Sequence, residues 1–126
     1  YFIGLYFQWA DPEGRILVPR AFPPSLYGRI MYRFFLRRIL AQVRGQGTGR
    51  KSPEHIRSDL DRHLAAVSDL VSANAFVLGP EPRLCDFALF AQLVYLGRTP
   101  AGGRAIAMRP AIGGYVDRMK ALRGKE

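Results

Sequence analysis

The residues of this sequence that could do chemistry are two histidines, one cysteine and a group of arginines. His55 and His63 are eight residues apart, about two helical turns, which is too far for both to bind one metal ion. Cys85 stands at an expected helix start, where the positive helix end lowers a thiol pKa, but the carboxylate of Asp86 and burial oppose that effect. We therefore expect surface histidines, a small core residue at Cys85, no metal site and no catalytic residue in this chain.

A glycine-rich and basic segment, Gln46–Lys51, is a second candidate, because backbone amides of such segments can bind phosphate. The segment lacks the Gly-Lys-Ser/Thr ending of a P-loop, and no strand is expected before it. We therefore expect a flexible connection between two helices rather than a phosphate site.

The net charge of +9 is concentrated in one part of the chain. The 14–53 segment contains nine arginine or lysine residues and no aspartate or glutamate, so it should attract anions. At about 100° per residue, one face of the helix expected over Ser25–Val43 is basic and the opposite face is apolar. The predicted apolar face consists of Tyr27, Met31, Phe35 and Ile39. The anion-binding candidates are Arg29, Arg33, Arg37 and Arg44 on the basic stripe, and Arg38 inside the apolar arc.

Two interpretations of these arginines remain open. Arg38 in the apolar arc would need an anion, a carbonyl group or a route to solvent. The stripe could dock an anionic partner, namely an acidic protein, a membrane surface or nucleic acid, and the chain would then be a non-catalytic binding module. Solvated arginines on an ordinary helix are the simpler interpretation, so neither nucleic acid nor a membrane is the expected partner.

Helical periodicity runs through most of the chain, and no alternating β-strand pattern competes with it. Ser52, Pro53 and Glu54 form a helix start, after which apolar residues recur at helical spacing to Val71. The other expected helices are Tyr1–Trp9, Ser25–Val43, a central apolar helix over Leu84–Leu96, and the segments 104–108 and 111–122. The expected non-helical parts are 10–24 with its four prolines, the turn 76–79 and a break at Gly102 and Gly103. The predicted fold class is all-α, a helical bundle forming one domain over residues 1–126.

The segment Phe76–Phe90 resembles the signature of the glutathione S-transferase C-terminal domain. That signature has an apolar run, a glycine, a capping Ser or Thr, an aspartate three residues later and then an apolar helix. Asp86 can accept a hydrogen bond from the amide of Arg83 and so act as a structural helix cap. Because Arg83 stands where the family has Ser or Thr, the reciprocal side-chain bond is missing.

A second block is similar to a bacterial branch of the same superfamily, related to metaxins and to the failed-axon-connections proteins. That branch shows a Gly-Gln-Gly-x-Gly-Arg-x-Ser stretch before its long helix. The matching residues are Gly45, Gln46, Gly47, Gly49, Arg50 and Ser52.

The resemblance implies a function for the chain. In that superfamily a thioredoxin-like N-terminal domain binds glutathione and activates its thiol, while the helical domain lines an apolar pocket for a small hydrophobic electrophile. No such N-terminal domain is expected in this chain, so the chain alone should be inactive. Transferases of this type are commonly dimers, so a homodimer is one expectation for the parent protein, although much of the usual interface lies in the other domain. The candidates for the substrate pocket are Tyr1, Leu5, Tyr6 and Trp9 on the first helix.

Two further expectations concern the natural protein. The sequence begins with Tyr rather than Met, inside an expected helix, which indicates a polypeptide that starts earlier. A single cysteine and the lack of a secretory or membrane-spanning segment favour the cytoplasm.

Overall fold

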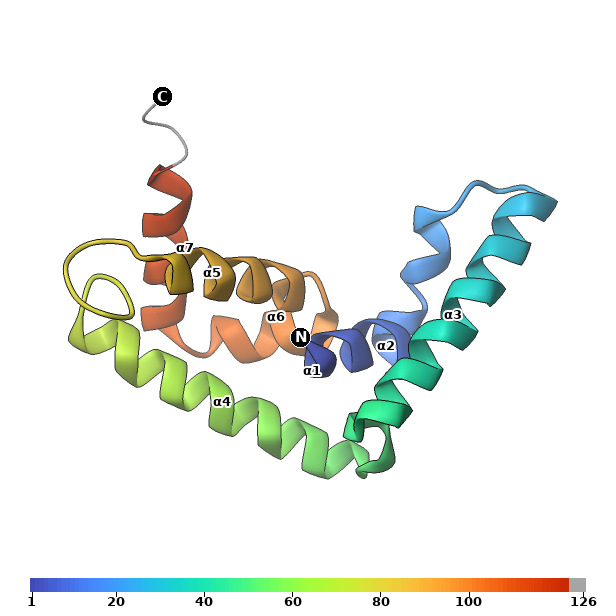
Figure 1. Cartoon of the computed structure of the whole chain (residues 1–126), viewed down its shortest axis with the longest axis horizontal. Coiled ribbons are helices and arrows are strands. Elements are labelled where there is room, and N and C mark those ends of the chain that lie inside the picture. Colours follow the sequence, from blue (N-terminus) through green and yellow to red (C-terminus); the bar gives the residue numbers. More distant parts are fainter. Residues whose placement is uncertain (123–126) are drawn as a thin grey trace.

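The computed structural model describes residues 1–122, which form helices and contain no β-sheet (Figure 1). The all-α prediction is therefore confirmed. An isolated bridge between Phe76 and Gly79 closes the predicted turn before α5. The elements are α1 (Phe2–Leu5), the π-helical turn η1 (Tyr6–Ala10), α2 (Pro12–Arg15), the 3-10 turn η2 (Val18–Ala21), α3 (Leu26–Gln46), the 3-10 turn η3 (Thr48–Arg50), α4 (Pro53–Ala73), α5 (Leu84–Gly97), α6 (Pro100–Ala107) and α7 (Pro110–Leu122).

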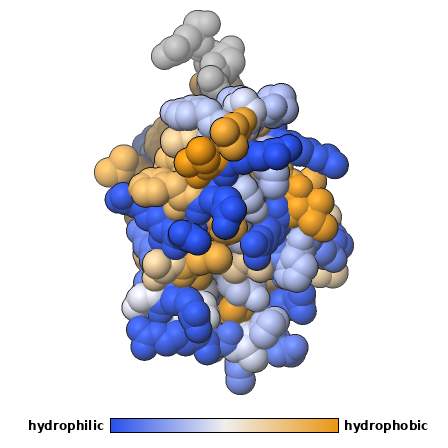
Figure 2. Space-filling view, turned by 90° about the vertical axis from the view of Figure 1, so that its right-hand side faces the viewer, coloured by the Kyte–Doolittle hydropathy of each residue, from blue (hydrophilic) through white to orange (hydrophobic). Residues whose placement is uncertain are grey.

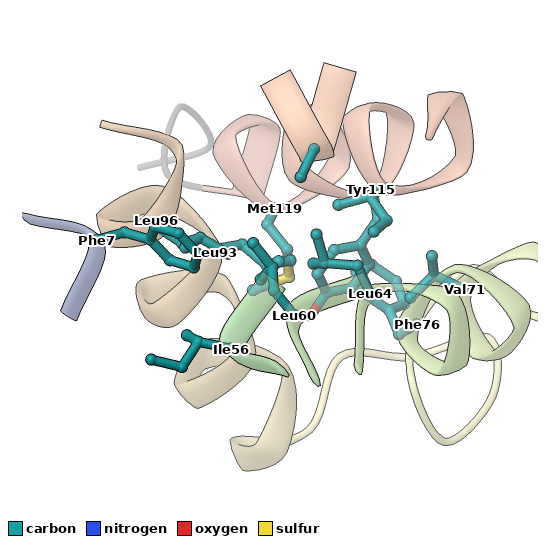
Figure 3. Close-up of a cluster of buried hydrophobic side chains, with 12 residues drawn as sticks. Phe7, Ile56, Leu60, Leu64, Val71, Phe76, Leu93, Leu96, Tyr115 and Met119 are labelled. Atoms are coloured by element: carbon teal, nitrogen blue, oxygen red, sulfur yellow. The ribbon is translucent and has the colours of Figure 1, made fainter. Parts of the chain in front are cut away.

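The main core lies between α4, α5, α6 and α7 and also receives Phe7 from η1 (Figure 3). The predicted start of α4 is confirmed, since Ser52 Oγ accepts a hydrogen bond from the amide of His55 at 3.3 Å and Pro53 occupies the first helical position. The buried residues of this core are Phe7, Ile56, Leu60, Leu64, Val71, Phe76, Leu93, Leu96, Ala105, Ile112, Tyr115 and Met119.

A smaller core joins α3 to the start of the chain. Leu5, Trp9 and Val18 pack there against Leu36 and Val43 of α3. In Figure 1, α3 runs along one edge of the molecule, with the 16–25 segment beside its first half. The helix therefore packs through α1, η1 and η3 rather than inside the α4–α7 bundle.

The predicted apolar face of α3 is wrong for two of its four residues. Ile39 packs against the smaller core and Met31 is half-buried, but Tyr27 and Phe35 are exposed. Arg38 is exposed as well. The buried face is instead made by Gly28, Tyr32, Leu36, Ile39, Leu40 and Val43.

A close approach to the proline-rich segment sets this rotation of α3. A Cβ atom at Gly28 would lie 1.9 Å from the carbonyl oxygen of Pro23, so only glycine permits the contact. Phe22 then stacks edge-on against Tyr32 with ring centroids 5.8 Å apart. Periodicity alone could not predict this rotation, because it depends on a segment outside the helix.

Two segments predicted to be irregular are helical. The 10–24 segment contains α2 and η2, because Pro12 and Pro19 occupy first-turn positions, where a missing amide costs nothing. Gly102 and Gly103 lie inside α6 instead of breaking the chain. Thr99 caps this helix, since its Oγ1 accepts a hydrogen bond from the amide of Gly102 at 3.0 Å.

The start of α5 is fixed by the fully buried carboxylate of Asp86. Its Oδ2 accepts from the amide of Arg83 at 2.9 Å, and its Oδ1 accepts from the amide of Val77 at 2.8 Å and from the hydroxyl of Tyr115 at 3.1 Å. The amide of Asp86 itself donates to the carbonyl of Arg83 at 2.9 Å, which replaces the missing Ser or Thr side chain. One carboxylate thus ties the 76–79 turn, α5 and α7 together.

The prediction that α5 lies at the centre of the domain holds for one face only. That face packs on α6, α7 and α1 and buries Leu93 and Leu96. On the other side Leu84 is 85% exposed and Phe87 is 52% exposed. Within residues 1–122, no element covers this second face.

Candidate functional site

A cavity of about 470 Å³ opens between α1, η3, α4 and α5. Its volume lies within the usual range of sites for small molecules. Apolar side chains form its wall, and its polar side chains come from the end of α3, the η3 turn and the residue after it, α4 and α5. The apolar wall consists of Phe2, Ile3, Leu60, Leu64, Val67, Leu89, Leu93 and Leu96. The polar side chains are Gln46, Thr48, Lys51, Asp59, His63 and Gln92.

The wall is a consequence of helical spacing on two helices. Leu60 and Leu64 are one turn apart on α4, and Leu93 and Leu96 are about one turn apart on α5, so each pair projects from one helix side. All four also belong to the main core, where Figure 3 shows them within one cluster. The cavity is therefore lined by side chains that the fold itself holds in place.

Asp59 is the acidic residue on the polar side of the cavity. It pairs with Lys51 and also accepts a hydrogen bond from Arg62 at 2.6 Å. The hydrogen bond from Lys51 is the main cause that holds the pKa of Asp59 below its ordinary value; partial desolvation opposes it and does not outweigh it. Asp59 is thus ionised at neutral pH, and its charge is balanced by that of Lys51, which lines the same cavity.

The segment predicted to be a flexible connection is an ordered part of the cavity. Gly47 ends α3 with φ = 112°, a left-handed conformation that favours glycine. The side chain of Arg50 then donates to the carbonyls of Arg44 and Gly45 at 2.9 and 3.0 Å. Buried Thr48 donates its hydroxyl to Gln46 Oε1 at 2.6 Å, so both side chains are oriented.

The structure does not bring the four sequence-derived pocket candidates together. Tyr1 lines the cavity. Leu5 and Trp9 are buried in the smaller core, where they pack against α3. Tyr6 is half-buried between the two cores, and its pKa is raised, first by burial and then by the nearby charge of Asp11.

The five arginines proposed for anion binding lie on the exposed surface of α3. Within residues 1–122, none of them pairs with a carboxylate. Arg33, Arg37 and Arg38 line a shallow groove together with Ile30 and Phe34. None of the five arginines lines the cavity between α1, η3, α4 and α5.

The remaining candidates are placed as follows. His55 is exposed at the start of α4, with Nδ1 at 3.1 Å from Ser52 Oγ, while His63 lines the cavity. Cys85 is half-buried, with Sγ at 3.8 Å from Asp86 Oδ2. The described part of the chain holds no cluster of three or more His, Cys, Asp or Glu residues suited to a metal ion. Among residues 1–122, no helix has the length and apolar character needed to cross a bilayer.

The sequence singled out His63 and the Gln46–Lys51 segment for other roles, but it did not predict that they meet Asp59 and Gln92 at one cavity. Asp59 and His63 are four residues apart on α4, next to Leu60 and Leu64, so a polar pair beside the apolar face was a visible signal. Gln92 was a second signal, as an uncharged polar residue inside an apolar helix. Neither pattern indicates which other segment completes the site, because Lys51 and Thr48 come from a turn.

Comparison with known proteins finds similarity to an enzyme in sequence alone. No family model matches the chain, and no solved structure matches it. The chain is 28% identical over 89 residues to the isoprene-epoxide glutathione S-transferase of Rhodococcus sp. (strain AD45), an alignment that covers 68% of the chain and 37% of that enzyme. The chain thus spans little more than a third of the length of this relative. By sequence it is similar to a glutathione S-transferase, and its all-α fold suits a helical domain of such a protein.

Proposed function

We propose that the chain is the helical domain of a glutathione S-transferase-like protein and that its cavity holds the second, apolar substrate of a glutathione-dependent reaction. The observation that carries this proposal is the combination in one cavity of a leucine-rich wall and a polar side with Lys51, His63 and Gln92. The similarity to an enzyme named for isoprene epoxide and glutathione supports the same substrate class, a small apolar electrophile such as an epoxide. Within the superfamily, the 45–52 segment supports the bacterial branch related to metaxins and failed-axon-connections proteins.

The residues of the cavity do not fit glutathione itself. This tripeptide carries two carboxylates and needs several free donors, but Lys51 is paired with Asp59 and the hydroxyl of Thr48 is donated to Gln46. We therefore assign glutathione and the activation of its thiol to a thioredoxin-like domain outside this sequence. The role of this chain is to bind the electrophile against Leu64 and its neighbours, to exclude water from its apolar part and to orient its polar group.

Binding of a small apolar epoxide to the isolated chain tests the cavity. Val67→Phe and Leu89→Phe place a ring in the cavity from half-buried positions that line it. Each change should weaken binding by about tenfold, which corresponds to about 1.4 kcal/mol. Leu70→Phe is the matched control, because Leu70 is exposed on α4, the helix that carries Val67, and does not line the cavity. Isothermal titration with the epoxide measures all three variants.

Two results would contradict the proposal. Equal affinities for Val67→Phe, Leu89→Phe and Leu70→Phe would show that the epoxide binds elsewhere or not specifically. Formation of a glutathione conjugate by the 126-residue chain alone would show that glutathione is held by this chain after all.

A further inference from the structure

The first half of α3 exposes apolar side chains on the side that faces away from the smaller core. Leu26 is 75% exposed, Tyr27 67%, Ile30 58% and Phe34 56%. Burial inside the molecule accounts for none of these four side chains, although each is large enough to stabilise the fold if buried. The outer face of α3, as the term is used below, consists of these four residues together with Arg29, Arg33, Arg37 and Arg38.

The arrangement on this face is regular. At about 100° per residue, Tyr27, Ile30 and Phe34 form one narrow strip along the helix. Arg33 and its neighbours one turn away flank the strip on one side, and Arg38 extends it on the other. Figure 2, which views the molecule from the side of α3, shows apolar groups interspersed with strongly hydrophilic ones.

The outer face of α3 is also positively charged, and no carboxylate within residues 1–122 pairs with its arginines. The 14–53 segment has no acidic residue. The first half of α3 packs on its own connecting segment, through Gly28 at Pro23 and through Phe22 with Tyr32 and Phe35, and its inner side meets the smaller core through Tyr32 and Leu36. Helix α3 lies at the edge of the molecule (Figure 1), and all residues of its outer face are exposed.

The residue types on the outer face of α3 favour one kind of binding partner over the others. A second copy of the chain would bring the same arginines together, and like charges repel. Nucleic acid would neutralise the arginines and leave the apolar strip in water. An anionic lipid surface satisfies both parts, since Tyr, Phe and Ile side chains enter the headgroup region while guanidinium groups bind phosphates bidentately.

We propose that the outer face of α3 binds peripherally to an anionic lipid bilayer, with the helix lying in the plane of the surface. From the sequence, solvated arginines on an ordinary helix were the simpler interpretation. The exposure of Tyr27, Ile30 and Phe34 changes that balance, because apolar side chains and arginines share one surface. The inference is separate from the cavity, since none of the residues of this face lines it.

Sedimentation of the 126-residue chain with lipid vesicles tests the proposal. Vesicles of phosphatidylcholine with about 30% phosphatidylserine should bind the chain, vesicles of phosphatidylcholine alone should not, and binding should fall with added salt. Removing one arginine should lower the partition coefficient about fivefold, so Arg33→Gln with Arg37→Gln should lower it about 25-fold. Ile30→Ser with Phe34→Ser should lower it by at least about tenfold.

Matched controls keep the test specific. Leu78→Ser and Arg98→Gln change an exposed leucine and an exposed arginine away from α3, and both should bind within about twofold of the unchanged chain. Far-UV circular dichroism checks that every variant is folded. Absence of binding to the anionic vesicles overturns the proposal. So does binding that depends on the arginines but not on Ile30 and Phe34, and so does binding to heparin or to an acidic helical peptide without binding to vesicles.

Discussion

Replacing Asp86 by asparagine should destabilise the domain far more than any surface charge change. The carboxylate is fully buried and accepts hydrogen bonds from the amides of Val77 and Arg83 and from the hydroxyl of Tyr115. Asparagine keeps one oxygen for Val77 and Tyr115, but its amino group must face the amide of Arg83, where donor meets donor. The charge that strengthens all three bonds is lost as well.

The expected cost follows from these contacts. A hydrogen bond to a charged group contributes about 1.5–3 kcal/mol, and a buried donor left without a partner costs about 1–3 kcal/mol. Asp86→Asn should therefore lower the free energy of unfolding by about 3 kcal/mol, and Asp86→Ala by about 3–5 kcal/mol. Tyr115→Phe should cost only about 1 kcal/mol, because the carboxylate keeps both amide donors. The total stability of such a domain is about 5–15 kcal/mol.

Urea unfolding followed by circular dichroism measures these differences. With a slope of about 2 kcal/mol per molar urea, Asp86→Asn should lower the unfolding midpoint by about 1.5 M. Asp69→Asn is the control, since Asp69 is exposed on α4 and its replacement should change the free energy of unfolding by less than about 0.5 kcal/mol, or the midpoint by less than about 0.25 M. An Asp86→Asn midpoint that coincides with that of Asp69→Asn would refute the assignment of Asp86 as the anchor of α5.

The stabilising effect of Asp86 should also depend on pH. Burial by itself raises the pKa of Asp86, but the amides of Val77 and Arg83 and the hydroxyl of Tyr115 outweigh it and hold the pKa below its ordinary value of 3.8. The stabilising effect of the ionised group is thus complete above the ordinary pKa and is lost as the pH falls through the lowered one. The stability difference between the unchanged chain and Asp86→Asn should be full at neutral pH and shrink as the pH falls below the ordinary pKa of 3.8. A difference that grows on acidification would contradict this sign.

Three smaller predictions concern other positions. Gly102→Ala should destabilise the chain by about 1–3 kcal/mol, because the new Cβ would lie 2.3 Å from the carbonyl oxygen of Leu96. Gly113→Ala, where the new Cβ enters open space, should stabilise the chain by about 0.5–1 kcal/mol. Thermal unfolding compares the two variants. Ser52→Ala should cost about 1 kcal/mol through the lost cap of α4, and Ser58→Ala, at an exposed position inside α4, should not, so equal urea midpoints would contradict the cap. Lys51→Met should raise the pKa of Asp59 toward its ordinary value, and an unchanged NMR titration of this carboxyl group would be the contrary result.

Local signals in the sequence were enough to predict α4 and the start of α5. For α4, the cap at Ser52, the proline that follows it and the spacing of Ile56, Leu60 and Leu64 all indicate the same helix and the same buried face. For α5, the relation of Asp86 to the amide of Arg83 spans only three residues. Both features depend on neighbours along the chain, and such features can be read from one sequence.

Features that depend on close packing between two elements could not be predicted, even where the residues are only five or six positions apart. The rotation of α3 is set by contact between Gly28 and the carbonyl of Pro23, and the helical state of Gly102 depends on close packing against Leu96. The presence of a glycine does not tell whether it breaks a helix or allows a close contact within one. The polar side of the cavity likewise needs Lys51 and Thr48 from one turn to meet Asp59 of α4, which only the fold brings about.

The anchor at Asp86 and the cavity can be separated experimentally, and that separation tests how the fold produces the site. Asp86 does not line the cavity, but it fixes the start of the helix that supplies Leu89, Gln92 and Leu93 to it. If the anchor acts only by holding the fold together, Asp86→Asn should lower the apparent affinity for an epoxide only in proportion to the unfolded fraction. Under conditions where the variant is still almost fully folded, its affinity should equal that of the unchanged chain. A loss of affinity in the folded variant would instead mean that the position of α5 itself adjusts to this one carboxylate.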